Sequence, residues 1–243
     1  MCRLSKHNSL ASPISPSRVQ LYHHENTYSY DRREAGRELA SHFRKYAGEP
    51  NVVVLALPRG GGPVAYEVAK ELGLPLDVFF VRGLGVPGYE ELAMGAIASG
   101  GVRVLNESAV AQLPDADRAL RDATAHETLV MERREAEYCD GRPAPDLRGK
   151  TVILVDDGLA TGATMRAAVM ALRQRQVARC VVGVPVSSPA TCAELRAEVD
   201  EIVCVITPKE FRAVGQFYED FSQTTDEEVR ELLAGAAGGG AGT

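Results

Sequence analysis

Tryptophan is absent from the 243-residue sequence, and aromatic residues make up only 6% of it. Proteins that bind single-stranded nucleic acid stack bases on aromatic side chains, so this scarcity argues against that class. The charge points the same way, because 27 Lys and Arg residues are outnumbered by 33 Asp and Glu residues, for a formal net charge of −6. The sequence therefore predicts no nucleic-acid partner, and an anionic ligand would need a local site.

The five cysteines are odd in number and form no C-x-x-C pair, so the sequence indicates neither a disulfide framework nor a zinc site. No apolar run approaches the roughly 18 residues that cross a bilayer. The first thirty residues also lack the continuous apolar stretch of a secretion signal. We therefore expect a cytoplasmic protein that does not contact membranes.

Hydrophobic residues make up 45% of the chain and charged residues 25%, which is the balance of a folded domain with a sizeable core. Residues 1–17 mix Ser, Pro and basic residues without periodicity, and residues 234–243 are almost entirely Gly and Ala. Both ends are predicted to be disordered tails. The folded domain is expected to span residues 18–233.

Short apolar runs alternate with helical patterns along the chain. The runs at 51–57, 74–83, 151–155, 180–188 and 201–206 predict strands, and the amphipathic segments 31–46, 63–72, 115–138, 164–173 and 189–198 predict helices. Strands that alternate with helices are typical of a doubly wound, mainly parallel α/β sheet. The charge run in 115–138 is interpreted as the solvated face of a long helix.

Residues 83–105 interrupt this alternation. Turn-forming residues dominate 83–91, and the segment 93–106 has two extended pieces joined by Ser99-Gly100-Gly101. The first part predicts a mobile loop and the second predicts a hairpin. Together they are expected to form a flap over a site.

The most informative segment follows the strand at 151–155. Two carboxylates, Asp156 and Asp157, are followed by the small-residue loop 158–164 and then by a helix. Ligands bind at this end of parallel strands, and small residues before a helix N-terminus let backbone N–H groups approach a phosphate. Adjacent acids repel phosphate but can accept hydrogen bonds from sugar hydroxyls or hold hydrated Mg²⁺. The pattern predicts a phosphorylated sugar as ligand, although one acid alone would also cap the helix.

A second loop, Pro58-Arg59-Gly60-Gly61-Gly62, follows the strand at 51–57. Taken alone it is only a turn, and a lone arginine is more often a surface residue than an anion ligand. Its presence beside the acidic loop favours the second interpretation.

The segment VILVDDGLATGAT resembles the motif that binds 5-phosphoribosyl 1-pyrophosphate (PRPP) in type I phosphoribosyltransferases, and PRGG at 58–61 resembles their pyrophosphate loop. From Asp31 to about Glu228 the chain resembles a bacterial subgroup of largely unassigned substrate. The resemblance implies that Asp156 and Asp157 contact the ribose hydroxyls and that Mg²⁺ is held beside them, mainly through PRPP. It assigns the 5-phosphate to Ala160, Thr161, Gly162, Ala163 and Thr164, and the pyrophosphate to Arg59, Gly60, Gly61 and Arg82. It also implies a cis peptide before Arg59 and a homodimer.

The activity implied is Mg²⁺-dependent transfer of the phosphoribosyl group to a nucleobase or another nitrogen acceptor, with release of pyrophosphate. Residues 207–233 occupy the place of the family's hood over the nucleobase, where Phe211 and Phe217 could stack on a ring. Glu90 and Glu91 of the flap could enter the closed site. A plainer interpretation is also open for each pair: the two phenylalanines could be core residues, and the two glutamates could be solvated.

Two positions depart from the family pattern. Gly83 stands where a lysine usually follows Arg82, and Ala160 stands where hypoxanthine–guanine enzymes have an aspartate. The alanine favours adenine-type loops over loops for 6-oxopurines. The missing lysine keeps open a PRPP- or nucleotide-sensing protein with little or no catalysis, and a hydrolase or phosphorylase is a weaker alternative.

Overall fold

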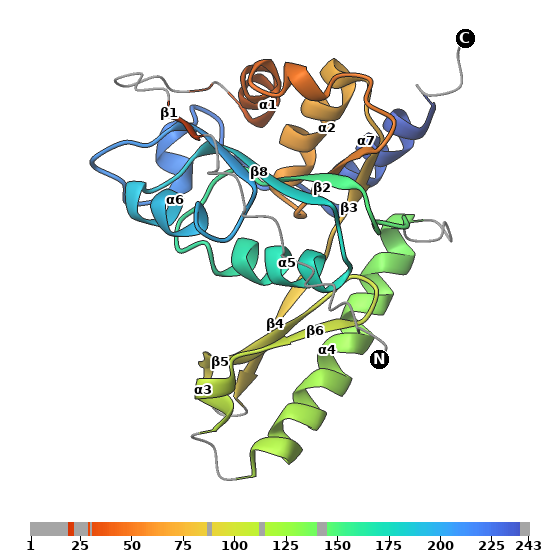
Figure 1. The fold of residues 1–243 in the computed structure, drawn as a ribbon, viewed down its shortest axis with the longest axis vertical. Coiled ribbons are helices and arrows are strands. Elements are labelled where there is room, and N and C mark those ends of the chain that lie inside the picture. Colours follow the sequence, from red (N-terminus) through yellow and green to blue (C-terminus); the bar gives the residue numbers. More distant parts are fainter. Residues whose placement is uncertain are drawn as a thin grey trace, which may run out of the picture.

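A six-stranded, wholly parallel sheet forms the centre of the molecule (Figure 1). The computed structural model describes residues 19–21, 29, 31–86, 89–111, 115–139 and 145–238. The strands, in their order across the sheet, are β1 (Val19–Leu21), β9 (Glu201–Ile206), β8 (Arg179–Val186), β7 (Thr151–Val155), β2 (Val52–Ala56) and β3 (Leu76–Val78). The predicted α/β class and parallel sheet are confirmed.

The sheet is covered on both faces, which explains why its strands are apolar without alternation. In β2, Val54 and Ala56 join the core beneath α1 (Arg32–Ser41) and α2 (Gly61–Leu72). Val53 and Leu55 join the opposite core. That second face is covered by α5 (Ala163–Gln174) and α6 (Pro189–Leu195), while α7 (Asp226–Gly238) packs on α2 (Figure 1).

Helix α1 begins where its sequence predicts, because the Asp31 side chain accepts a hydrogen bond from the Glu34 N–H at 2.8 Å. Its packing on α2 is close at Gly36, where a Cβ atom would lie 2.6 Å from the Val64 carbonyl oxygen. This contact fixes the start of α1 beside the glycine loop that precedes α2.

The strand order reverses between β2 and β7. The chain runs outward from β2 through α2 to β3, whereas from β7 it runs the other way through β8 to β9. In doubly wound sheets the crevice at such a reversal is the usual ligand site. The loops that leave β2 and β7 are the two that carry the sequence motifs.

A separate antiparallel sheet of β4 (Val81–Val86), β5 (Tyr89–Ala98) and β6 (Val102–Leu105) extends from the body with α4 (Ala116–Cys139), as Figure 1 shows. The hairpin predicted over 93–106 is present as β5 and β6. The prediction of a loop over 83–91 is wrong for the described residues, since 83–86 and 89–91 are strand. Glycines concealed the strand: register shifts between Leu84 and Val86 place an irregularity at Gly85, where the lack of a side chain allows a bulge.

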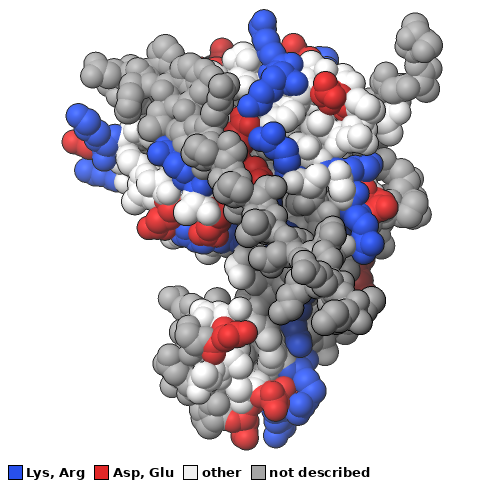
Figure 2. Space-filling view, viewed as in Figure 1, with Lys and Arg blue, Asp and Glu red and all other residues white. Residues whose placement is uncertain are grey.

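The remaining elements are short: α3 (Glu107–Val110) and the 3₁₀ turns η1 (Arg44–Tyr46) and η2 (Val214–Phe217). Helix α7 continues to Gly238, into the segment predicted as a tail, because its alanines are strong helix formers. The predicted tail 1–17 lies outside the described residues. None of the described helices is both long and apolar enough to span a membrane. On the face drawn in Figure 2, basic and acidic side chains are intermixed.

Candidate active site

The glycine loop after β2 and the acidic loop after β7 lie in direct contact. The two strands are paired in register, with Ala56 opposite Val155, and the Leu57 N–H donates to the Val155 carbonyl at 2.9 Å. A Cβ atom at Gly60 would lie 2.1 Å from Oδ2 of Asp157. A Cβ atom at Gly61 would lie 2.7 Å from the Val155 oxygen. The two predicted ligand loops can meet only because these positions lack side chains.

Replacing Gly60 with alanine is therefore expected to destabilise the protein. The added methyl group would displace the Asp157 carboxylate, and overpacking of this kind costs about 1–3 kcal/mol. Thermal unfolding should show a lower Tm for Gly60→Ala. Gly235→Ala in α7 is the control, because its Cβ would make only an ordinary contact at 3.7 Å with Tyr66. Equal Tm values for the two variants would contradict the packing described.

Asp156 and Asp157 are adjacent in the chain and only partly exposed. The Asp157 N–H donates to Oδ1 of Asp156 at 2.9 Å. Burial raises the pKa of Asp156 well above its usual range, and the neighbouring charge of Asp157 raises it further. Burial also raises the pKa of Asp157, although the Arg32 guanidinium opposes that shift. Two desolvated acids of this kind are stabilised by hydrogen-bond donors and cations.

Two residues from elsewhere in the chain hold Asp157 in place. The Arg32 Nε donates to Asp157 Oδ2 at 2.8 Å, and the Tyr218 hydroxyl donates to the Asp157 carbonyl at 2.6 Å. Arg32 was not among the predicted site residues. No local signal identifies it, because it lies 125 positions from its partner and looks like one of several charges on an amphipathic helix.

The predicted phosphate loop, 160–164, leads into the N-terminus of α5. Gly162 has a left-handed φ of 70°, and it precedes the first helical turn, whose N–H groups have no acceptor within the helix. Two side chains donate hydrogen bonds to carbonyl groups of this loop. The Thr191 hydroxyl donates to the Ala160 carbonyl at 2.7 Å, and the Arg166 Nη2 donates to the Thr161 carbonyl at 2.8 Å. Except for Gly162, the residues from Ala160 to Thr164 are exposed, so the loop is open to an anion.

Arg59 follows a cis peptide bond at Pro58, as the family resemblance implies. Its Nη1 lies 3.9 Å from Oδ2 of Asp226, whose carboxylate also accepts a hydrogen bond from the Tyr138 hydroxyl. Asp226 begins α7 and Tyr138 lies near the end of α4. The guanidinium of Arg59 is therefore at the edge of the glycine loop, with a single carboxylate 3.9 Å away among the described ion pairs.

Arg82 contacts helix α4, whereas Arg59 lies near the start of α7. The Arg82 Nε donates to Oε2 of Glu127 on α4 at 2.7 Å, which ties the base of the antiparallel sheet to that helix. Its assignment to pyrophosphate remains a prediction, and in this structure its contact is with α4. The side chains of Glu90 and Glu91 lie outside the described part of the structure.

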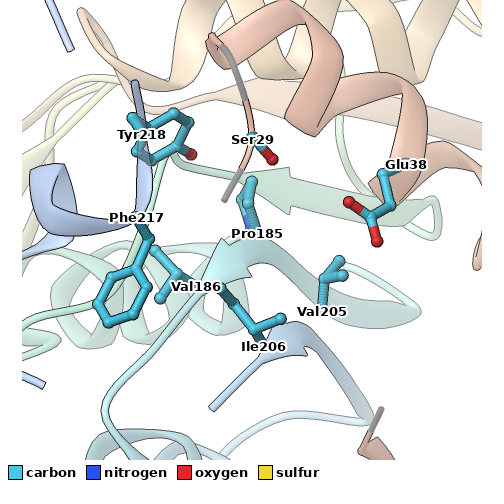
Figure 3. Close-up of a pocket in the computed structure, with 8 residues that line it drawn as sticks. All are labelled: Ser29, Glu38, Pro185, Val186, Val205, Ile206, Phe217 and Tyr218. Carbon is cyan, nitrogen blue, oxygen red and sulfur yellow. The ribbon is translucent and has the colours of Figure 1, made fainter. Parts of the chain in front are cut away.

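The two phenylalanines predicted to stack on a base lie against each other. The rings of Phe211 and Phe217 are nearly parallel, with centroids 5.8 Å apart. Phe217 packs with Val186 and Tyr218 in a small core between the hood and the end of β8. Figure 3 shows it beside a cavity of about 10 Å³, room for about one water molecule. The plainer interpretation, a core aromatic, fits Phe217, while Phe211 is partly exposed.

Comparison with known proteins identifies the family. The sequence profile of the phosphoribosyl transferase domain matches residues 29–222. The chain belongs to the phosphoribosyltransferase family. It is 46% identical over 204 residues to proteins of Mycobacterium tuberculosis strains CDC 1551 and H37Rv that are provisionally named phosphoribosyl transferases. The match covers 84% of this chain and 46% of each relative, so the chain spans about half the length of these relatives.

A solved structure shares the fold of this chain. The crystal structure of TT1426 from Thermus thermophilus is 42% identical, with a TM-score of 0.76, and the match covers 85% of this chain and 98% of that one. The family resemblance noted in the sequence is confirmed by the profile match and by the relatives. The parallel sheet, with its two motif loops at the strand reversal, is the phosphoribosyltransferase fold.

The acidic pair has the chemistry to help hold a Mg²⁺ ion that is bound largely by phosphate oxygens. Within the described residues no group of three or more His, Cys, Asp or Glu side chains converges. Mg²⁺ commonly binds through one or two carboxylates and substrate phosphates while keeping several waters. Asp156 and Asp157 supply that number of carboxylates, next to the loop predicted to hold pyrophosphate.

Proposed function

We propose that this protein binds PRPP with Mg²⁺ and transfers the phosphoribosyl group to a nucleobase or another nitrogen acceptor, releasing pyrophosphate. The observation that carries the proposal is the contact between the two loops. The carboxylates of Asp156 and Asp157, the N-terminus of α5 and the glycine loop with Arg59 all follow the carboxyl ends of the paired strands β2 and β7. They are complementary to ribose hydroxyls, a 5-phosphate and a pyrophosphate, respectively.

The charges of PRPP define its orientation between the two loops. The 5-phosphate would lie on the N–H groups of 160–164, because a helix N-terminus favours anions. The ribose hydroxyls would donate to the acidic pair, whose desolvation strengthens such bonds. The pyrophosphate would then lie by Gly60 and Gly61, within reach of Arg59.

In the reaction, the bond between C1 of the ribose and the pyrophosphate oxygen breaks and its electrons leave with pyrophosphate. A lone pair of the acceptor nitrogen forms the new bond to C1, and the nitrogen loses a proton to solvent or to a base. Bound Mg²⁺ would supply charge neutralisation on the leaving group. Arg59 and the loop N–H groups would stabilise the same negative charge, and the acidic pair would hold the sugar as positive charge develops on it.

The direct test is pyrophosphate release from PRPP and Mg²⁺ in the presence of adenine, other nucleobases and simple nitrogen acceptors. Product analysis separates the alternatives, because transfer gives a nucleotide, whereas a hydrolase gives ribose 5-phosphate without an acceptor. A folded protein that binds PRPP but releases no pyrophosphate would reject catalysis in favour of sensing. A folded protein that does not bind PRPP would reject the proposed function altogether.

The alternative function is PRPP sensing with weak catalysis. It is favoured by Gly83, which stands where the family usually has a lysine, and a substitution at this position tests it. A Cβ atom at Gly83 would meet nothing within 4 Å, so a side chain can begin there without a clash at its Cβ. We expect Gly83→Lys to fold normally and to raise the rate of pyrophosphate release by roughly tenfold or more, because a cation near the leaving group stabilises its charge. Gly83→Gln is the control for length without charge. Equal rates in both variants would contradict a limiting role for the missing cation.

A further inference from the structure

Arg32 lies next to the acidic pair and makes several contacts there, although it belongs to neither sequence motif. Its side chain is 11% exposed. Nε donates to Asp157 Oδ2 at 2.8 Å, and Nη1 donates to the Ser222 carbonyl at 2.7 Å. The guanidinium carbon lies 3.9 Å from the ring centroid of Phe221 and 5.9 Å from that of Tyr218. One side chain of α1 thus touches both the acidic motif and the hood.

The hood segment that Arg32 contacts is also joined to the motif by its own side chains. The Tyr218 hydroxyl donates to the Asp157 carbonyl, and the Tyr218 and Phe221 rings pack with centroids 5.0 Å apart. A Cβ atom at Gly158 would lie 2.5 Å from Val214, so the hood covers the motif backbone closely. The position of the hood and the orientation of Asp157 therefore depend on the same contacts.

The geometry leaves the acidic pair able to bind a ligand. Arg32 occupies Oδ2 of Asp157 through a single Nε donor. A carboxylate offers about four lone-pair positions on its two oxygens, so Oδ1 of Asp157 can still accept from a hydroxyl. An arginine keeps its positive charge at all relevant pH values, and a planar guanidinium can bond at its edge while its face stacks on an aromatic ring. Both features are used at Arg32.

We propose that Arg32 is a positioning residue of the PRPP site, which orients the Asp157 carboxylate toward the ribose hydroxyls and holds hood residues 218–222 against the acidic motif. This inference rests on the proposed function, and it adds to it a residue outside the family motifs. Arg32 itself need not touch PRPP, since its donors are directed to Asp157 and Ser222.

The first experiment uses the protein without ligand and measures the Tm of wild type, Arg32→Gln and Arg32→Lys. Arg32→Gln should lower the Tm, because the charge that pairs with Asp157 and the stacking on Phe221 are lost, and Arg32→Lys should recover part of the loss by keeping the charge. Arg37→Gln, on the same helix, is the matched control, because Arg37 is 51% exposed and its Nη1 lies 3.9 Å from Oε2 of Glu67. Equal Tm values for Arg32→Gln and Arg37→Gln would contradict the hold of Arg32 on the motif and the hood and overturn the proposal.

The second experiment measures PRPP binding with Mg²⁺ by calorimetry and, where turnover is found, KM and kcat. Arg32→Gln should raise the Kd for PRPP about tenfold or more, the scale of a lost hydrogen bond to a charged group. Arg32→Lys should restore part of the affinity. An unchanged Kd in Arg32→Gln overturns the inference alone. Absence of PRPP binding by the wild type overturns the proposed function, whatever the ligand-free Tm values show.

Discussion

Asparagine at position 156 is expected to abolish PRPP binding while making the ligand-free protein more stable. Burial and the charge of Asp157 both raise the pKa of Asp156, so its ionised form is disfavoured in the folded state. Stability should therefore fall as the pH rises above the ordinary Asp value of about 3.9, and Asp156→Asn removes this loss. A higher Tm than that of the wild type is therefore expected for Asp156→Asn at pH 7.5, with the difference shrinking as the pH is lowered toward the ordinary Asp value. The amide oxygen of asparagine can still accept from the Asp157 N–H.

Asparagine at position 157 should also abolish binding, but it should stabilise the ligand-free protein less than Asp156→Asn does. Burial raises the pKa of Asp157 as well, but the Arg32 guanidinium opposes that rise, and removing the charge would also take the counter-ion from Arg32. The two variants therefore differ in their effect on folding and share the loss of the ligand.

Thermal unfolding with and without PRPP and Mg²⁺ measures both quantities at once. For the wild type, a ligand concentration of about one hundred times Kd should add about 2.7 kcal/mol of stability. For a protein of this size each kcal/mol moves Tm by about 2–4 °C. Neither variant should show the ligand shift. A ligand shift retained by Asp156→Asn would contradict the placement of the ribose, and a lower ligand-free Tm for that variant would contradict the electrostatic argument.

Strands β2, β7, β8 and β9 could be predicted from the sequence because they are almost entirely buried, with helices on both faces of the sheet. The runs NVVVLAL and TVILV contain no polar residue between their ends, and such runs of strand length, each followed by a helix, are typical of parallel sheets. β1 could not be predicted, since three residues, Val19–Leu21, carry no periodicity and are fixed only by pairing with β9. The β4 strand was concealed by Gly83 and Gly85, because glycine also occurs in turns.

The candidate site was predictable to the extent that its residues are contiguous in sequence. The acidic loop and the glycine loop each carry a local pattern, and the pairing of β2 with β7 brings them together. Arg32, Thr191 and Asp226 carry no such pattern, because each acts through contacts with distant segments. Contacts of that kind depend on the packed structure. For the same reason, sequence spacing alone could not show that Phe217 lies in the small core between the hood and the end of β8.

Glutamine in place of Arg59 is expected to lower kcat for pyrophosphate release by about 10²–10³-fold, the range found when one donor to a developing oxyanion is removed. Arg59 is about one-third exposed at the edge of the glycine loop, with Asp226 at 3.9 Å. In the ligand-free protein Asp226 is thus an anionic partner for Arg59, and a bound pyrophosphate would compete with it. The substitution leaves the backbone of Gly60 and Gly61 in place, so the loss reports on the charge.

Three comparisons isolate the role of Arg59. Its replacement should weaken binding of PRPP and pyrophosphate but leave ribose 5-phosphate binding unchanged, because that ligand lacks the leaving group. Asp226→Asn should keep the acceptor for Tyr138 and leave PRPP binding equal or tighter, since it removes the competing charge. Arg133→Gln, at an 82% exposed side chain on α4, controls for loss of one positive charge. If Arg59→Gln weakens the binding of ribose 5-phosphate and of PRPP equally, Arg59 does not belong to the pyrophosphate site. The loss of binding would then come from a general disturbance of the two loops.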